Sequence, residues 1–194
     1  TLLWSNRDIE TVDNSEYAKE PPYVVGFSNA SISNIWRVGM LHSIQQAAAD
    51  NSDLIEKLIV TDANDDPSKQ VSDIQDLLQR DVDILIVSAA QSEALDAVVS
   101  RATRSGTPVV MVDRRVSSDN FVSFVTASDL ALGRFMAQWI AEKLEGKGKI
   151  VMLSGIAGAS PAELRLATAK QVFAEFPEIE ILEVQYTDWS PAKG

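Results

Sequence analysis

Cysteine is absent from this sequence of 194 residues, which excludes disulfides, zinc–thiolate sites and thiol nucleophiles together. Histidine is almost absent as well: His42 is the only one, so a Ser-His-Asp triad or a multi-histidine metal site has little to build from. No apolar run approaches the length of a bilayer span, and we expect no direct insertion into a membrane. Positive charge is scarce too. The formal net charge of −11 opposes the approach of a phosphate backbone, and we expect no nucleic acid partner.

Phosphate-binding and nucleophile motifs are also missing. The segment from Gly146 to Lys149 lacks the spacing of a P-loop and precedes an apolar run, whereas a P-loop follows one. Residues 155–158 contain two of the three glycines of a dinucleotide-binding fingerprint, which favours a tight turn. Ser154 has no glycine two residues before it, as a nucleophile elbow requires. We predict that the protein is not an enzyme and that it uses no cofactor and no metal ion.

The first 22 residues differ from the rest of the chain. Residues 1–22 are acidic and aperiodic, and they end in Pro21-Pro22, a pair that neither continues a helix nor joins a β-ladder. We predict a loosely held N-terminal arm. The alternative is that the Trp4 side chain docks on the body of the protein. The sequence begins at Thr1 without a charged and apolar leader, so we expect that an export signal was removed or lies outside it.

From Tyr23 onward, short apolar runs alternate with longer segments of helical period. The predicted strands cover residues 23–27, 58–60, 83–87, 108–112, 121–125, 149–153 and 179–184. Helices are predicted after the caps Ser33-Asn34, Asp66-Pro67 and Asp129, and over residues 95–102 and 162–176. Strands this apolar, each followed by an amphipathic helix, are typical of parallel sheets with helices on both faces. The fold class is therefore α/β, with Rossmann-like doubly wound sheets.

In such sheets, ligands bind beyond the carboxyl ends of the strands. The polar residues at these ends are Ser28, Ser88, Asp113 and Ser154. Asp113-Arg114 places a carboxylate beside a guanidinium, and the two groups can accept and donate paired hydrogen bonds to vicinal hydroxyls. This chemistry suits a neutral polyol. The alternative is a surface salt bridge.

A second group of candidate residues follows the first strand. Trp36 offers a flat apolar face for sugar C–H groups, while Asn34 and Arg37 beside it supply hydrogen-bond donors. The alternative role for Trp36 is a core or interface residue.

These residues resemble the type I periplasmic binding proteins, in particular the ribose- and galactofuranose-binding members. The segments that carry the resemblance are Val25–Ser28, Asn34–Arg37, Val112–Arg114, Thr126–Asp129, Gly155–Ser160 and Asp188–Gly194. The resemblance spans Tyr23 to Gly194 and implies two Rossmann-like lobes, with an N-terminal lobe over residues 23–127 and part of a C-terminal lobe over residues 128–194. Trp36-Arg37 stands where ribose receptors have two phenylalanines, which favours the galactofuranose-type branch.

The resemblance implies that a monosaccharide, a pentose or a hexose with furanose forms included, binds in the cleft between lobes that hinge shut. The loaded receptor would then deliver the sugar to the membrane permease of an ABC transporter in the periplasm. The ligand-binding residues carried over by motif position are Ser28, Asn34, Trp36, Arg37, Ser88, Asp113, Arg114, Ser128, Arg165 and Trp189. Family members continue for about another domain, so we expect the C-terminal part of the second lobe to be missing from this sequence.

Three other functions are compatible with this fold. One is the sugar effector domain of a LacI-type transcription regulator, which should carry a basic helix-turn-helix before Tyr23, where this sequence has the acidic arm. Another is the ligand-binding domain of a periplasmic sensor, which would use the same closure. A third is an enzyme on a Rossmann-like sheet, which the missing cofactor fingerprint disfavours.

Overall fold

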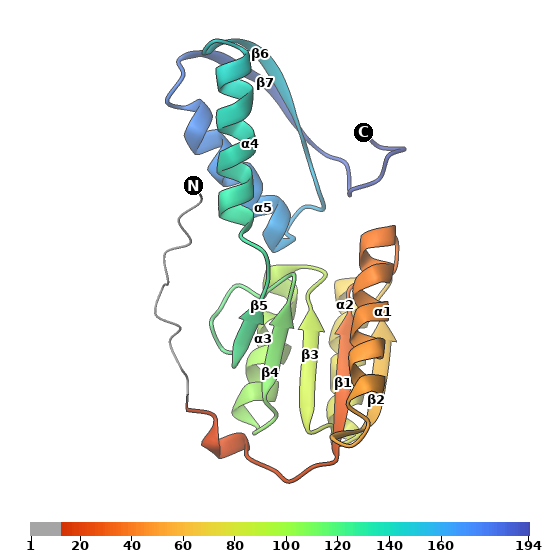
Figure 1. Cartoon of the computed structure of the whole chain (residues 1–194). Helices are drawn as coiled ribbons and strands as arrows, with labels where there is room; N and C mark the ends of the chain where they lie inside the picture. Colours follow the sequence, from red (N-terminus) through yellow and green to blue (C-terminus); the bar gives the residue numbers. More distant parts are fainter. Residues whose placement is uncertain (1–12) are drawn as a thin grey trace.

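The computed structural model describes residues 13–194 (Figure 1), so Trp4 and most of the predicted arm lie outside the described residues. The chain forms two sheets, and we call each sheet with its own helices a lobe, the first and the second in chain order. The strands of the first sheet are β1 (Tyr23–Asn29), β2 (Ile55–Asp62), β3 (Ile84–Ser88), β4 (Val109–Val112) and β5 (Ser123–Val125), with helices α1 (Ile35–Asp50), α2 (Pro67–Gln79) and α3 (Ser92–Arg104). The second sheet contains β6 (Lys147–Ser154) and β7 (Glu178–Tyr186), with helices α4 (Asp129–Lys143) and α5 (Ser160–Phe173).

The first sheet is parallel throughout, in the order β2-β1-β3-β4-β5. Neighbouring side chains of a strand point to opposite faces. Accordingly, Asn29 of β1 contacts Arg37 of α1, whereas Ser28 contacts Gln70 of α2. Helix α1 therefore lies on one face, and α2 and α3 lie on the other (Figure 1). This is the doubly wound arrangement that the sequence predicts.

The main hydrophobic core lies between this sheet and helices α2 and α3. Ile74 and Leu77 of α2 and Leu95 and Val99 of α3 have no exposed surface, and they pack against strand residues such as Met111. Burying side chains of this size stabilises the fold by about 1.5–3 kcal/mol each. The first sheet is therefore a firm platform for the loops at its carboxyl edge.

Two predicted helix starts are confirmed by their caps. The Asn34 side chain accepts a hydrogen bond from the backbone N–H of Arg37 at 3.0 Å. The Asp66 side chain accepts from the backbone N–H groups of Ser68 and Lys69 at 2.8 and 3.1 Å, ahead of proline at the first helical position. Each side chain satisfies donors that the first turn of a helix leaves without a partner.

The predicted start of α4 is wrong by one residue. Ser128 is the N-cap, and its hydroxyl accepts from the backbone N–H of Ala131 at 3.2 Å. Asp129, predicted as the cap, is the first helical residue, and its carboxylate instead accepts a hydrogen bond from Arg165. Ser128 and Asp129 are both residue types that cap helices. Because Asp129 pairs with Arg165 of α5, Ser128 is left to cap α4.

The second sheet has two parallel strands, with α4 and α5 packed on one face. The helices approach closely because α4 has glycine at position 133. A Cβ there would lie 2.7 Å from the backbone oxygen of Arg165. Ala137, Ala141 and Phe173 then fill the space between the helices and the sheet.

The other face of this sheet is open in the described part of the chain. Val151 and Leu153 of β6 are 53 % and 59 % exposed. Met136 of α4, which lines a pocket together with β6, is exposed as well. This open face agrees with the expectation that the second lobe is incomplete in this sequence, since apolar strands indicate burial and the described residues leave one face of the sheet uncovered.

Most predicted elements are present, with shifted ends. Strand β2 is longer than predicted because parallel pairing with β1 begins at Ile55. Strand β5 is shorter because Phe121 lies in a turn, with its N–H bonded to the Asp119 carbonyl. At the amino end of the central strand β3, Lys19 forms an ion pair with Asp83 at 2.6 Å and connects the end of the arm to the sheet.

Among residues 13–194, no helix has the length and apolar character needed to cross a membrane.

Candidate functional site

A cavity of about 560 Å³ lies where the carboxyl edge of the first sheet faces the start of α5. Its wall is contributed by the start of α1, the end of β4, the connection between the lobes and the segment after β7. The lining residues are Asn34, Trp36, Arg37, Met40, Val112, Asp113, Arg114, Val125, Thr126, Ala127, Asp129, Pro161, Arg165 and Trp189. A cavity of this volume, lined mainly by apolar surface with a few convergent charged groups, is typical of a small-molecule site.

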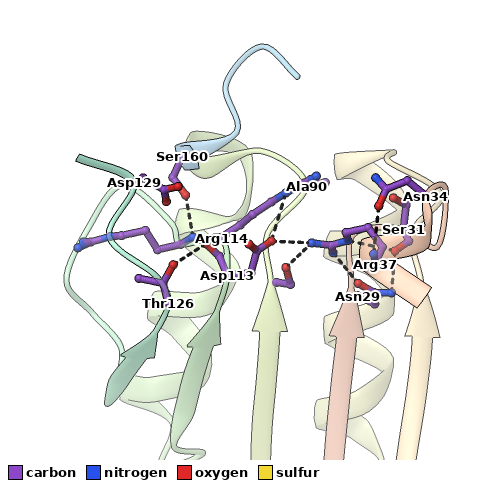
Figure 2. A network of polar contacts seen from close by, with 12 residues as sticks. Asn29, Ser31, Asn34, Arg37, Ala90, Asp113, Arg114, Thr126, Asp129 and Ser160 are labelled. Atoms are coloured by element: carbon purple, nitrogen blue, oxygen red, sulfur yellow. Dashed lines mark hydrogen bonds and ion pairs between the residues drawn. The ribbon is translucent and has the colours of Figure 1, made fainter. Parts of the chain in front are cut away.

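Arg37 lies at the centre of a buried hydrogen-bond network on the first lobe (Figure 2). Its guanidinium donates to Asn29 Oδ1 at 2.5 Å, Ser88 Oγ at 3.0 Å and Asp113 Oδ2 at 2.9 Å, and its Nε donates to the Ser31 carbonyl at 3.2 Å. The side chain is 2 % exposed. Arg37 therefore fixes the ends of β1, β3 and β4 relative to one another and orients the Asp113 carboxylate.

Asp113 follows β4 directly and adopts φ +62°, a left-handed conformation that aspartate tolerates better than most residues. This backbone turn directs the carboxylate toward the cavity. Its Oδ2 atom receives the hydrogen bond from Arg37 and lies 3.8 Å from Nε of Arg114. Within residues 13–194, Oδ1 takes part in no hydrogen bond or ion pair, so this oxygen is an acceptor available to a ligand.

Arg114 is also buried, with a side chain 3 % exposed, but its guanidinium makes no hydrogen bond within the described residues. The charge faces Asp113 and, at 3.7 Å, Asp65. Its Cζ lies 4.9 Å from the ring centroid of Trp189, in cation–π contact. Arg114 thus brings to the cavity wall a guanidinium without protein hydrogen bonds, whose Nη1 is enclosed on the side of Asp65, and it covers part of the Trp189 indole.

The second lobe contributes a second pair of acid and guanidinium. Nε and Nη2 of Arg165 both lie 2.8 Å from Oδ1 of Asp129, which is 7 % exposed. Helix α4 supplies the acid and helix α5 the guanidinium. Both residues line the same cavity as Asp113.

The charges at this site balance one another. Each guanidinium at the cavity has a carboxylate partner in the described structure: Arg37 with Asp113, Arg114 with Asp65, and Arg165 with Asp129. An anionic ligand would meet no uncompensated positive charge, and a cationic ligand no uncompensated negative charge. The arrangement suits a neutral ligand with several hydroxyl groups.

Burial changes the acid–base properties of the first-lobe residues. It lowers the pKa of Arg37 to about 10, with Arg114 adding repulsion, and it also lowers the pKa of Arg114. Both guanidiniums keep their charge at neutral pH. Burial raises the pKa of Asp113 above its usual 3.8, and the nearby guanidiniums of Arg37 and Arg114 oppose the increase. Asp129 adds repulsion and Arg165 attraction from the second lobe.

The raised pKa of Asp113 predicts how binding depends on pH. Ligand affinity should be constant near neutral pH and should fall on acidification through the pKa of Asp113, earlier than for an aspartate titrating at 3.8. The stability of the unliganded protein should respond to pH in the opposite direction. Folded Asp113 binds its proton more tightly than Asp113 in the unfolded chain, so this residue favours folding at low pH, and its contribution is lost as the pH rises through its folded pKa. Calorimetric titration across this range, with circular dichroism to confirm folding, tests the prediction. Affinity that stays flat while the fold persists would contradict it.

The structure brings seven of the ten predicted site residues to the cavity. These are Asn34, Trp36, Arg37, Asp113, Arg114, Arg165 and Trp189. The other three do not line it. Ser28 contacts Gln70, Ser88 accepts from Arg37, and Ser128 caps α4. Of the two predicted indoles, Trp36 is 57 % exposed and offers its ring to the cavity.

Sequence reasoning missed two polar residues that shape the site. Gln70 is fully buried, and its amide donates to the carbonyls of Ser28 and Ser88 and accepts from the N–H of Ala90. It thereby holds the ends of β1 and β3 together. Asp129 was predicted only as a cap. A glutamine among the apolar positions of α2 was the available signal for the first residue, and no local signal existed for the second.

The two lobes touch beside the cavity through the loop before α5. The N–H of Ser92 donates to the Gly158 carbonyl, and the N–H of Arg115 donates to Ser160 Oγ, both at 3.0 Å. Gly158 has φ +77°, and a Cβ there would lie 2.8 Å from the Gln91 side chain. A larger residue would therefore strain the backbone at this position and force the Gln91 side chain to move.

Comparison with known proteins agrees with this geometry. The sequence family described as the periplasmic binding protein domain matches residues 25–194 of this chain. The ribose import binding protein of Haemophilus influenzae is 35 % identical over 138 residues, which cover 71 % of this chain and 47 % of the relative. That of Bacillus subtilis is 30 % identical over 181 residues, which cover 93 % and 57 %. These relatives are binding proteins. The chain spans about half the length of the curated relatives that it matches.

Solved structures show the same architecture. The fructose-binding periplasmic domain of a hybrid two-component system matches with a TM-score of 0.82 and 30 % identity, over 88 % of this chain and 56 % of that one. The periplasmic binding protein of an arabinose ABC transporter from Shewanella, bound to arabinofuranose, matches with a TM-score of 0.79 and 28 % identity, over the same shares. The predicted α/β fold of the type I periplasmic binding proteins is confirmed.

Proposed function

Because this chain belongs to the periplasmic binding protein domain family, and its site combines balanced charges with free hydrogen-bonding groups, we propose that it captures a neutral monosaccharide between its lobes. The sugar is a pentose or hexose, furanose forms included, and the protein delivers it to an ABC transporter from the periplasm. The observation that carries the proposal is the pairing of every cavity guanidinium with a carboxylate, while Asp113 Oδ1 and Arg114 keep free acceptor and donor positions.

The arrangement supports sugar binding in a specific way. Asp113 Oδ1 accepts from one hydroxyl and the Arg114 guanidinium donates to its neighbour, which is the pattern that a vicinal diol requires. Trp36 supplies an apolar face for the C–H groups of the ring. The names of the relatives, which bind ribose, fructose and arabinose, support the same class of ligand.

A thermal-shift panel on the full-length protein tests the proposal. At a sugar concentration of about 100 times the Kd, binding should stabilise the native state by about 2.7 kcal/mol and raise the Tm by several degrees. Neutral pentoses and hexoses should include the sugar that produces this shift. The matched uronic acid and amino sugar should not, because their charge finds no partner in the balanced site. A shift with the charged sugars alone, or with no sugar in the panel, would contradict the proposal.

A second candidate is the ligand-binding domain of a sensor. The observation that favours it is the match to the periplasmic domain of a hybrid two-component system. Uptake of the radiolabelled sugar distinguishes the two functions. Deletion of the gene should abolish uptake if the protein serves a transporter. If uptake persists while a sugar-dependent phosphorylation signal is lost, the protein is a sensor.

A further inference from the structure

The two buried arginines of the first lobe differ in how their charge is satisfied. Arg37 makes hydrogen bonds through all three of its nitrogens, whereas Arg114 makes none within the described residues. Nη1 of Arg114 is buried without a hydrogen-bond partner, and the same is true of Oδ1 of Asp65, which lies 3.7 Å away. Two buried atoms of opposite charge therefore face each other in a contact slightly longer than a hydrogen bond.

We propose that Asp65 is a positioning residue of the ligand site, which draws the Arg114 guanidinium away from Asp113 and keeps Asp113 Oδ1 and the Arg114 donors free for a sugar. The inference rests on the proposed function. Without Asp65, the nearest carboxylate to Arg114 would be Asp113, at 3.8 Å, and a guanidinium readily takes both oxygens of one carboxylate. Such pairing would occupy the oxygen that a ligand hydroxyl needs.

The backbone holds Asp65 in place for this role. The residue lies between β2 and α2 with φ +59°, in the left-handed region. Its N–H donates to the Ala30 carbonyl at 2.7 Å, and the N–H of Ala63 donates to the Asn29 carbonyl at 3.0 Å. Asp66, the next residue, caps α2. The loop is thus fixed to the end of β1 and to α2 on either side of Asp65, which holds the backbone of this residue beside Arg114.

Asp65→Asn is the variant that tests the inference, because asparagine preserves both shape and tolerance of positive φ. Sugar affinity should fall about tenfold, a size typical of coupling between contacting members of one ion-pair network. In an Arg114→Met background, the same substitution should have no further effect, since Asp65 acts through Arg114. Asp53→Asn, an exposed position of the first lobe, is the control for loss of one charge and should leave affinity unchanged.

A measurement without ligand separates this inference from the proposed function. Carbon-13 NMR titration of the Asp113 carboxyl in the unliganded protein should show a lower pKa in Asp65→Asn than in the wild type, by more than the same substitution produces in the Arg114→Met background. The lost charge of Asp65 acts in both backgrounds, whereas closer pairing with Asp113 requires Arg114. The charged groups facing Asp113 from the other elements, Arg37, Asp129 and Arg165, are unchanged in the variant. If the wild type binds no neutral sugar but the titration shifts, the proposed function fails and the positioning role stands. An unshifted titration, or equal affinity losses with and without Arg114, would overturn the inference.

Discussion

Replacing Arg37 by leucine should lower the free energy of unfolding by about 3 kcal/mol or more, the range measured when one partner of a buried ion pair is removed. The substitution leaves the buried Asn29 and Ser88 oxygens without their donor and removes the closest counter-charge of Asp113. Each buried polar group left unpaired adds a desolvation penalty of about 1–3 kcal/mol. Urea denaturation should show a lower midpoint with an unchanged slope, which marks a loss of stability without a change in the surface exposed on unfolding.

Arg101→Leu is the matched control for this variant. Arg101 is exposed on α3, so the same chemical change at its position should alter stability by no more than about 0.5 kcal/mol. If the two variants were equally stable, the buried network would not hold the strand ends as described. Sugar binding offers a second comparison, since Arg37→Leu should also weaken affinity by releasing the Asp113 carboxylate.

Asp113→Asn should reduce sugar affinity about 100-fold, which corresponds to about 2.7 kcal/mol. The substitution replaces a charged acceptor by an amide, which can turn an NH₂ group toward the hydroxyl that Oδ1 of Asp113 would bind. Losses of about 2–5 kcal/mol are usual when a buried, hydrogen-bonded charge in an interface is removed. Asparagine is the informative replacement because it tolerates φ +62°, whereas alanine would add backbone strain at that position. Isothermal titration calorimetry with the sugar found in the thermal-shift panel measures the change.

Asp119→Asn serves as the control, because the Asp119 side chain is 91 % exposed in the loop that follows β4. Its affinity should equal that of the wild type. Affinity of Asp113→Asn within a factor of about two of the wild type would remove Asp113 from the ligand site. The proposed binding of a vicinal diol would then lack the hydrogen-bond acceptor assigned to Asp113 Oδ1.

The fold could be predicted largely from the sequence because its signals are local. Apolar runs bounded by turn residues mark the strands, and caps such as Asn34 and Asp66 mark the helix starts. The errors occur where a distant partner decides. Asp129 caps nothing because Arg165, 36 residues away, takes its carboxylate. The open face of β6 follows from the expected incompleteness of the second lobe, but residue type alone does not show which segment would cover Val151 and Leu153.

The candidate site could be predicted only in part, because strand ends locate a site but do not assign the tasks within it. Asp113 and Arg114 were found from their place after β4, yet Ser28 and Ser88, found by the same rule, turned inward to Gln70 and Arg37. Whether a side chain at a strand end faces the ligand or a neighbouring strand depends on the alternation of faces and on the helix packed above it. That choice is made by tertiary packing.

The contacts that join the lobes beside the cavity use main-chain groups of Ser92, Arg115 and Gly158 and the hydroxyl of Ser160, none of which lines the cavity. Substitutions at Trp36, an exposed residue of the cavity wall, should therefore leave these contacts between the lobes in place. Selection can act on the two separately. Under the proposed function, divergence in the cavity wall would change sugar specificity while these contacts between the lobes stay the same.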